Sequence, residues 1–190
     1  MPAPVTARTV APPRDRILHA AHELFYRDGI RATGIDRVIA ESGVAKVTFY
    51  RQFPSKDDLI LAFLAFRHER WMAWFVDALE RHGGTPLAIA PALGEWLRGA
   101  DFRGCAFLNS VGELATALPA VLDVTRRHTQ DMTAAVARLI KPAPGRARTA
   151  RALALAIDGA IVQAQFHESP DAALESLAVV AKALAGSRAR

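Results

Sequence analysis

Apolar side chains recur every three to four positions through most of the chain, which is the period of an amphipathic α-helix. We find no stretch with the convincing alternation that a β-strand requires. Prolines and glycines divide the pattern into about nine predicted helices, at residues 14–28, 34–42, 45–52, 56–81, 86–98, 104–118, 119–141, 146–167 and 171–185. Pro91 falls inside the fifth and should kink or split it, because proline lacks a backbone N–H. The pattern predicts an all-α protein.

Residues at the predicted helix ends support these boundaries. Gly29 and Gly43 follow the first two helices, where glycine closes a helix at little steric cost. Thr33 is the expected N-cap of the second helix, and Ser55 with Asp58 is expected to cap the fourth. The first 13 residues precede any helix, and their four prolines predict a disordered arm.

Two of the predicted helices are short and lie close together within residues 35–53. Gly43 supplies a sharp turn between them, and Val44 is placed to pack between the two helices. A longer helix precedes them, which completes the pattern of a helix-turn-helix unit whose second helix can enter the major groove of DNA. Short helix pairs with an intervening glycine also occur in all-α cores that bind no DNA, so the flanking residues must decide.

Polar side chains flank this unit at positions where DNA contacts are expected. The candidates for phosphate contacts carry a hydroxyl or a cation: Thr33, Thr48, Tyr50 and Lys56. Lys56 lies in the first turn of its helix, where the helix dipole disfavours a cation unless an anion lies opposite. For base readout, Lys46 can donate to guanine and Val47 can contact a thymine methyl group. A phosphate contact of Lys46 is the alternative.

Composition and charge narrow the class of protein. The chain has 190 residues, of which 51% are hydrophobic and 23% charged, with a single cysteine, so neither a disordered chain nor a disulfide scaffold is expected. Its longest uncharged stretch, residues 82–94, is too short to span a membrane, and we expect a soluble, cytoplasmic protein. The net charge of +5 is uneven, since residues 1–56 carry nine Lys and Arg against five Asp and Glu. This basic segment favours a polyanionic partner.

A dense set of residues between positions 14 and 61 has a specific spacing. The set comprises Leu24, Phe25, Gly29, Thr33, Ile39, Ala40, Gly43, Val44, Thr48, Phe49, Tyr50, Phe53 and the run from Ser55 to Leu59. It resembles the N-terminal domain of TetR-type transcriptional repressors. The resemblance implies that the helix at 45–52 reads double-stranded operator DNA. It also assigns contacts with the DNA backbone to Thr33, Thr48, Tyr50 and Lys56.

Two positions depart from the family pattern. Ala45 stands where many members have a serine cap, and Val47 stands where a small residue is frequent. Both begin the reading helix and remain candidate DNA contacts, so the operator sequence does not carry over from relatives. The resemblance also implies a DNA-binding domain at 14–60 and a ligand-binding and dimerisation domain at 61–190.

A second motif lies in the C-terminal part of the chain. The run at residues 102–109 with Glu113 is similar to a pattern, GC-x-F-x-N…E, in one broad group of TetR-type C-terminal domains. On a helix Cys105, Asn109 and Glu113 would share a face, where buried polar groups need partners. A ligand is one such partner, but we favour a backbone or helix partner. Cys105 is expected to be a buried small side chain, and no metal site or cofactor is expected.

Aromatic residues are frequent in the same part of the chain. Each one by itself is best interpreted as core, but the resemblance implies a pocket for a small apolar or aromatic effector. The candidate ligand-binding residues are Trp71, Phe75, Trp96, Phe107, Asn109, Glu113, His128, Met132 and Gln163. Either Glu113 or Asp158 would favour a cationic effector.

The last two predicted helices carry small and apolar residues at helical spacing. These are Ala150, Leu153, Ala154, Ile157, Ala160, Ile161 and Ala164, then Leu174, Leu177, Ala178, Ala181 and Leu184. Two such helices per subunit would form a four-helix bundle and a homodimer. The alternative is that both helices pack only within their own subunit.

Together these features predict a homodimeric regulator of transcription, a repressor that a small molecule releases from a palindromic operator. No nucleophile–base pair, metal cluster or phosphate loop points to an enzyme. A helical carrier or enzyme, and an architectural DNA-binding protein without sequence preference, are the alternatives. Repressor and activator are not distinguished by the sequence.

Overall fold

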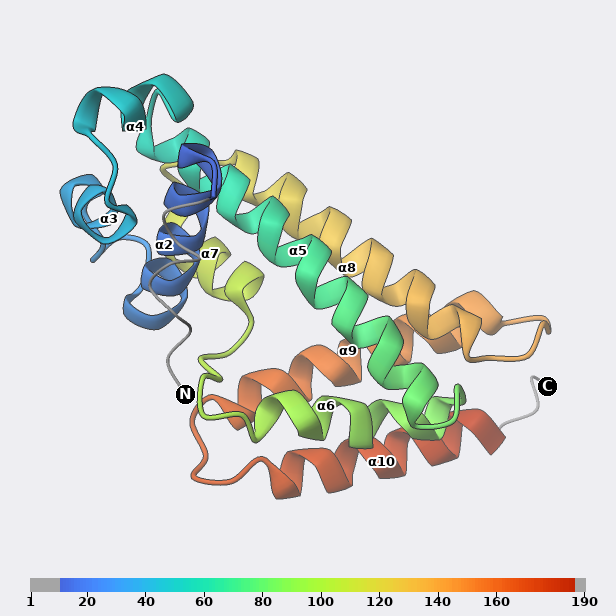
Figure 1. Ribbon diagram of the computed structural model, residues 1–190. Coiled ribbons are helices and arrows are strands. Elements are labelled where there is room, and N and C mark those ends of the chain that lie inside the picture. The colour runs from blue at the N-terminus through green and yellow to red at the C-terminus, as the bar shows by residue number, and fades with distance from the viewer. Residues whose placement is uncertain (1–10, 187–190) are drawn as a thin grey trace. The chain divides into compact units, whose positions relative to one another are not determined.

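The computed structural model describes residues 11–186, and this part of the chain is helical without any strand (Figure 1). Its helices are α2 (Pro13–Asp28), α3 (Ile35–Ser42), α4 (Lys46–Gln52), α5 (Lys56–Arg81), η1 (Pro86–Ala88), α6 (Ile89–Leu97), α7 (Ala106–Leu114), α8 (Ala120–Arg138), α9 (Arg146–Ala164) and α10 (Asp171–Gly186). The all-α prediction is confirmed. The predicted arm lies outside the described residues except for its last three, and Pro13 already belongs to α2.

The described helices group into two compact units. The first unit contains the chain up to Arg67 together with Ser110–Val124, and the second contains His68–Asn109 and the chain from Thr125 onward. Helices α5, α7 and α8 each begin in one unit and continue into the other. The first unit therefore includes more of the chain than residues 14–60. The functional domain boundaries stay a prediction.

In the first unit α2 packs against both α3 and α4. Leu24 and Phe25 of α2, Val38 of α3 and Phe49 of α4 are buried. Burial of a side chain of this size contributes about 2 kcal/mol. The short helices α3 and α4 are thus held on one face of α2 by apolar packing.

The start of α5 has the capping box that the sequence predicts. The Ser55 hydroxyl accepts the Asp58 backbone N–H at 3.1 Å, and an Asp58 carboxylate oxygen accepts the Ser55 backbone N–H at 3.1 Å. Both bonds satisfy donors that a helix start leaves unpaired. This explains why α5 begins at Lys56, as predicted.

The predicted fifth helix is divided, and Pro91 lies in the first turn of its second part. The 3₁₀-helix η1 ends at Ala88 and α6 begins at Ile89, so Pro91 is the third residue of α6. A backbone N–H has no partner within the helix at that position, so proline is tolerated there. The predicted split is observed.

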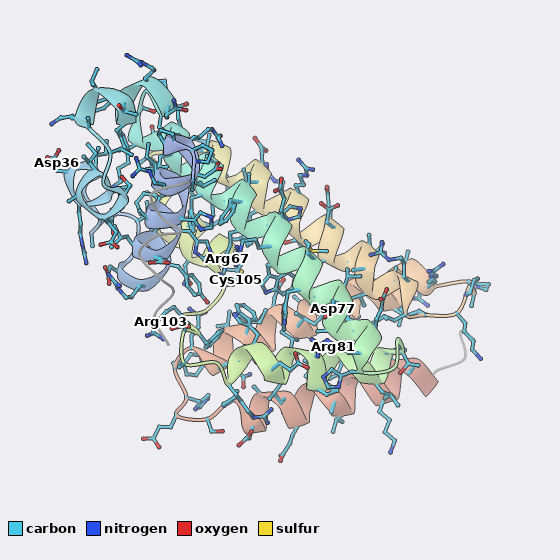
Figure 2. All side chains as sticks on the ribbon, in the orientation of Figure 1. Asp36, Arg67, Asp77, Arg81, Arg103 and Cys105 are labelled. Atoms are coloured by element: carbon cyan, nitrogen blue, oxygen red, sulfur yellow. The ribbon has the colours of Figure 1, made fainter. Side chains whose placement is uncertain are left out.

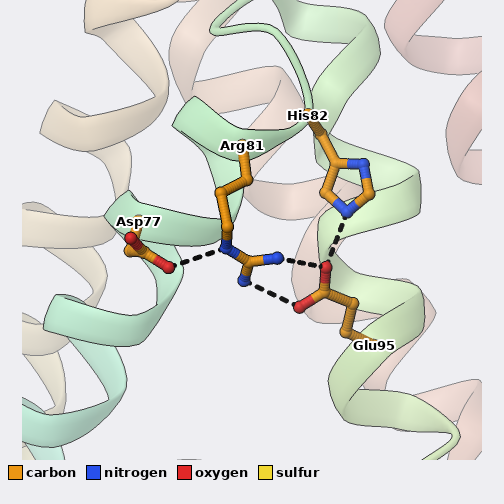
Figure 3. A network of polar contacts seen from close by, with 4 residues as sticks. All are labelled: Asp77, Arg81, His82 and Glu95. Atoms are coloured by element: carbon orange, nitrogen blue, oxygen red, sulfur yellow. Dashed lines mark hydrogen bonds and ion pairs between the residues drawn. The ribbon is translucent and has the colours of Figure 1, made fainter.

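The end of α5 is tied to α6 by charged side chains of the second unit (Figures 2 and 3). Arg81 donates to both carboxylate oxygens of Glu95 at 2.7 and 2.8 Å, and to Asp77 at 2.8 Å. His82 shares a further contact of 2.7 Å with Glu95. The hydrogen bonds from Arg81 and His82 lower the pKa of Glu95 to about 2. The carboxylate therefore stays ionised, and the network spans the turn between the two helices.

The core of the second unit forms where α6 and α9 both pack against α10 (Figure 1). Its buried side chains include Leu93 of α6, Leu153, Ile157 and Ile161 of α9, and Leu174 and Leu177 of α10.

None of the helices in the described part of the chain is both long enough and apolar enough to cross a membrane.

Candidate functional site

A turn that begins at Gly43 joins α3 to α4. Gly43 has φ 64° and ψ 29°, and its backbone N–H donates to the Ile39 carbonyl oxygen at 3.1 Å. This left-handed conformation favours glycine. Val44 is buried after it, as predicted for a residue that packs between the helices. The turn and the buried valine together set the direction in which α4 leaves α3.

Helix α4 has one buried and one exposed face. Phe49 is fully buried, and its ring centroid lies 6.3 Å from that of Phe53. The side chains of Lys46, Val47, Tyr50 and Arg51 are exposed, and Thr48 is half-buried. Val47 is 67% exposed, which is high for an apolar side chain on a helix with a buried opposite face. The arrangement leaves one face of the predicted reading helix available to a partner.

Lys46 forms an ion pair with Asp36 of α3 across this face. The Lys46 Nζ lies 3.2 Å from a carboxylate oxygen of Asp36, and both side chains are well exposed. Figure 2 labels Asp36 on α3. Exposed ion pairs contribute at most about 1 kcal/mol, so this pair holds Lys46 only weakly. The DNA contacts of Ala45, Lys46, Val47, Thr48 and Tyr50 stay a prediction.

Thr33 has a different role from the predicted one. Gly34, and not Thr33, is the N-cap of α3. Thr33 is fully buried, and its hydroxyl donates to the Gly29 carbonyl oxygen at 2.8 Å. The capping prediction was therefore wrong. The hydroxyl stabilises the loop between α2 and α3, and a DNA contact of Thr33 stays a prediction.

Lys56 and Glu113 both contact this loop. The Lys56 Nζ donates to the Ile30 carbonyl oxygen at 2.7 Å, and burial lowers the pKa of Lys56. Glu113 accepts the Arg31 backbone N–H at 3.0 Å within the first unit. An ammonium group has three donors, so a phosphate contact of Lys56 stays a prediction. We favoured a backbone or helix partner for Glu113 over a ligand, and its partner is a backbone N–H, although nothing in the sequence indicated that of Arg31.

The second unit contains an aromatic cluster, which we define as Trp71, Trp74, Phe75, Trp96, Phe107 and His128. Trp71 stacks on Phe75 with ring centroids 4.6 Å apart, and its ring lies 5.8 Å from Trp96 and 5.0 Å from His128. His128 stacks on Phe107 at 3.8 Å. Four of the predicted ligand-binding residues are thus brought into direct contact with Trp71 or its neighbours. Met132 is also buried in this unit.

Two polar groups within the cluster are notable. The Trp71 Nε1–H is buried and has no hydrogen-bond partner among the residues that the structure describes. His128 is buried, and its Nδ1 lies 3.2 Å from the Nδ1 of His68, whose other ring nitrogen lies 3.2 Å from Asp131. Buried donors normally find a partner, so the orphan indole N–H marks a place where an acceptor would be stabilised.

Asn109 has the structural partners that we favoured. Its side-chain amide donates to the Arg103 carbonyl oxygen at 3.1 Å, and its oxygen accepts the Gln165 amide at 3.0 Å. Gly104 has φ 89°, a backbone conformation that favours glycine, and a Cβ atom there would also require Gln165 to move. Gln163, another predicted ligand-binding residue, is exposed on α9.

The structure buries Cys105, as expected for a small apolar side chain. Within residues 11–186 it shows no group of three or more His, Cys, Asp or Glu side chains arranged to hold a metal ion.

Helices α9 and α10 each have an exposed apolar face. On α9 it is formed by Leu155, Val162 and Phe166, the last lying just after the helix, and on α10 by Val179 and Val180. Leu155 is 74% exposed and Phe166 is 66% exposed. Most residues that we predicted for the dimer contact, such as Leu153, Ile157 and Leu177, are instead buried within the subunit. That assignment of faces was wrong, because the small-residue face packs α9 on α10.

Asp158 lies on α9 and is partly buried. Burial raises the pKa of its carboxyl group to about 6. The uncharged form is therefore favoured over a wider pH range than for an exposed aspartate.

Comparisons with known proteins also point to regulators of transcription. The family model described as bacterial regulatory proteins, tetR family, matches residues 17–63. A curated relative, an HTH-type transcriptional regulator in the lacX 3′ region of Lactococcus lactis subsp. lactis, is 26% identical over 107 residues. These are 54% of this chain and 55% of the relative, so the match spans about half of the relative's length.

Two solved structures extend the comparison. A TetR-family transcriptional regulator from Streptomyces coelicolor is 30% identical, and the match covers 95% of this chain and 91% of that chain with a TM-score of 0.79. The multidrug binding protein EbrR complexed with malachite green is 24% identical, with 88% and 96% of the two chains covered and a TM-score of 0.67. The latter similarity concerns the fold alone.

The raised pKa of Asp158 predicts a pH-dependent stability. Between the ordinary aspartate pKa of 3.8 and about 6, the folded protein binds the proton more tightly than the unfolded chain does. The free energy of unfolding should therefore fall as the pH rises through this interval and then level off. At pH 7.5 the free energy of unfolding of Asp158→Asn should exceed that of wild type by about 1 kcal/mol, a figure reduced for the partial exposure of the side chain. Near pH 3.5 the two free energies of unfolding should be equal.

Urea denaturation at a series of pH values measures this difference. Asp101→Asn, at an exposed position of the same unit, is the control. A constant difference between wild type and Asp158→Asn from pH 3.5 to 7.5 would contradict the assignment.

Proposed function

Because the chain belongs to the TetR family of transcriptional regulators, we propose that it is a homodimeric repressor that a small apolar or aromatic molecule releases from a palindromic operator. DNA binding and transcription regulation follow from membership of the family. The relatives named above are described as regulators of transcription and not as enzymes. The repressor role, the dimer, the operator symmetry and the effector are the proposed part. A cytoplasmic location is proposed with them, since the DNA of bacteria lies there.

The exposed face of α4 is the observation that carries the proposed operator recognition. Phe49 anchors the helix from one side, while Lys46 and Val47 project from the other. A cation and an apolar side chain at adjacent positions suit guanine and the thymine methyl group, respectively. Two such helices related by a two-fold axis would read two half-sites, which is why a palindromic operator is proposed.

The exposed apolar faces of α9 and α10 support a second copy of the chain as the dimer partner. Leu155, Val162 and Phe166 recur at intervals of seven and four residues along α9, while Val179 and Val180 of α10 add a second helix. A two-fold contact between two helices of each subunit gives a four-helix arrangement. This face lies opposite the buried one, so dimerisation would cost the subunit core nothing.

The aromatic cluster supports the proposed effector. Its stacked rings favour a planar molecule, and the unpartnered Trp71 N–H favours one that carries a hydrogen-bond acceptor. Binding of the aromatic dye malachite green by EbrR, a protein of the same fold, is consistent with this chemistry. Helix α5 carries Lys56 at its start and Trp71 and Phe75 further along, and we propose that it links effector and DNA. The effector must bind the two conformations with different affinities to shift DNA binding.

Replacement of Lys46 tests operator recognition. An operator is first selected from genomic DNA fragments, and the affinities of wild type and Lys46→Ala are then measured for all single-base variants of it. We expect Lys46→Ala to lose discrimination at one position, by about 1–3 kcal/mol, because a base contact is removed. A phosphate contact would instead weaken binding to every sequence equally. Equal affinity of wild type for operator and random DNA would overturn the proposed regulator.

A charge on the exposed face of α9 tests the dimer. We expect the wild type to sediment as a dimer at micromolar concentration and Leu155→Asp to sediment as a monomer with much weaker operator binding. Leu155 is exposed within the subunit, so the substitution should leave the fold intact. Leu87→Asp, at an apolar residue of η1 that is also exposed, is the matched control and should remain dimeric. A monomeric wild type would exclude the proposed dimer.

Quenching of tryptophan fluorescence tests the effector site. The probes are malachite green and the pair 2-acetylnaphthalene and 2-ethylnaphthalene, which differ in a carbonyl acceptor. We expect the ketone to bind the wild type about 5–10-fold more tightly than the hydrocarbon, as one hydrogen bond allows. Trp71→Phe should abolish this preference and Trp74→Phe should keep it. The absence of binding by all three probes would overturn an aromatic effector.

A further inference from the structure

One peptide group in the loop between α2 and α3 is held by two charged side chains. Lys56 donates to the carbonyl oxygen of Ile30 at 2.7 Å, and Glu113 accepts the N–H of Arg31 at 3.0 Å. These two atoms belong to the same peptide bond, which is trans like all others in the described part of the chain. In a trans peptide C=O and N–H point in opposite directions. The Lys56 cation and the Glu113 carboxylate therefore bind one peptide group from opposite sides. We call this arrangement the peptide clamp.

The electrostatics of the peptide clamp favour a fixed geometry. Hydrogen bonds with an ionised partner are roughly twice as strong as those between neutral groups. Burial lowers the pKa of Lys56, whereas the negative charge of Glu113 acts in the opposite direction and favours the ammonium form. Glu113 therefore favours the charged form of Lys56, and both side chains hold the peptide between them.

The peptide clamp acts on the segment that leads into the DNA-binding helices. On the other side of the loop, the buried Thr33 hydroxyl donates to the Gly29 carbonyl oxygen at 2.8 Å. The following residue, Gly34, is the N-cap of α3, and α3 in turn sets the start of α4. With both sides of the loop hydrogen-bonded, the path of the chain from α2 into α3 is fixed.

We propose that Glu113 is a positioning residue for operator recognition, which together with Lys56 holds the Ile30–Arg31 peptide so that α3 and α4 meet DNA in the correct orientation. The inference rests on the proposed operator recognition by α4. Glu113 reaches the loop from 82 residues further along the chain, and Lys56 from 26 residues away. Neither side chain needs to touch DNA in this role.

Substitutions of Glu113 test the proposal in the full-length protein. Glu113→Ala removes the acceptor, and we expect its operator affinity to fall about tenfold while its affinity for random DNA stays equal or rises, because a negative charge is lost. Glu113→Gln keeps an acceptor without the charge and should lose about threefold. Glu23→Gln, the same change at an exposed position of α2, should leave the ratio of operator to random affinity unchanged.

Hydrogen exchange of the Arg31 amide without DNA separates positioning from a general loss of structure. Exchange should become faster in Glu113→Ala, and less so in Glu113→Gln, while the amides of α2 keep their protection. Loss of protection throughout the first unit, with operator and random affinity falling together, would overturn the proposal. An unchanged affinity ratio would overturn it as well. A wild type without operator preference would instead overturn the proposed regulator itself.

Lys56→Gln, alone and combined with Glu113→Ala, tests whether the two side chains of the peptide clamp act together on operator affinity. If Lys56 acts through the clamp, the double variant with Glu113→Ala should bind operator no more weakly than the weaker single variant, since neighbours in one network are not additive. Losses of operator affinity that add up in the double variant would contradict the clamp.

Discussion

Helix α4 has only seven residues, and an isolated helix of that length is not stable in water. Its existence depends on the burial of Phe49, which contributes on the order of 2–3 kcal/mol. Other parts of the first unit make this burial possible. Helix α2 provides the surface on which α3 and α4 pack, Gly43 permits the turn, and Val44 fills the space between the helices. A short helix held by one side has its other side free, and this is the side that we assign to DNA.

The same division into held and free faces recurs in the second unit. Helix α9 packs its small and apolar residues on α10 and leaves Leu155 and Val162 exposed. Apolar surface of this kind is costly in water and favours association. In both α4 and α9 the buried face packs within its own unit, and the exposed face is available to a partner.

Local signals explain how much of the fold is predictable from the sequence. The bounds of α5 follow from Ser55 with Asp58 at its start and from the two glycines after Arg81, and both signals act within a few residues. The helix-turn-helix follows in the same way from Gly43 and the apolar positions around it. The reading face of α4 needs only the period of a helix and one buried aromatic residue.

The contacts that the sequence did not reveal join residues that are far apart. Nothing near Glu113 indicates that its partner is a backbone N–H 82 residues earlier. Periodicity shows that α9 has apolar faces, but not which of them meets α10. Thr33 has the side chain of an N-cap, yet its position one residue too early places the hydroxyl in the core. In each case the outcome depends on which segment arrives from elsewhere in the chain.

Helix α7 is nine residues long, which corresponds to about 14 Å of rigid backbone. Asn109, bonded to Gln165, lies a single turn before Glu113, which binds the Arg31 amide. Residues four apart lie on the same face of a helix, so both side chains leave α7 in similar directions. A single face of this short helix thus binds an amide side chain 56 residues away along the chain and a backbone N–H 82 residues away.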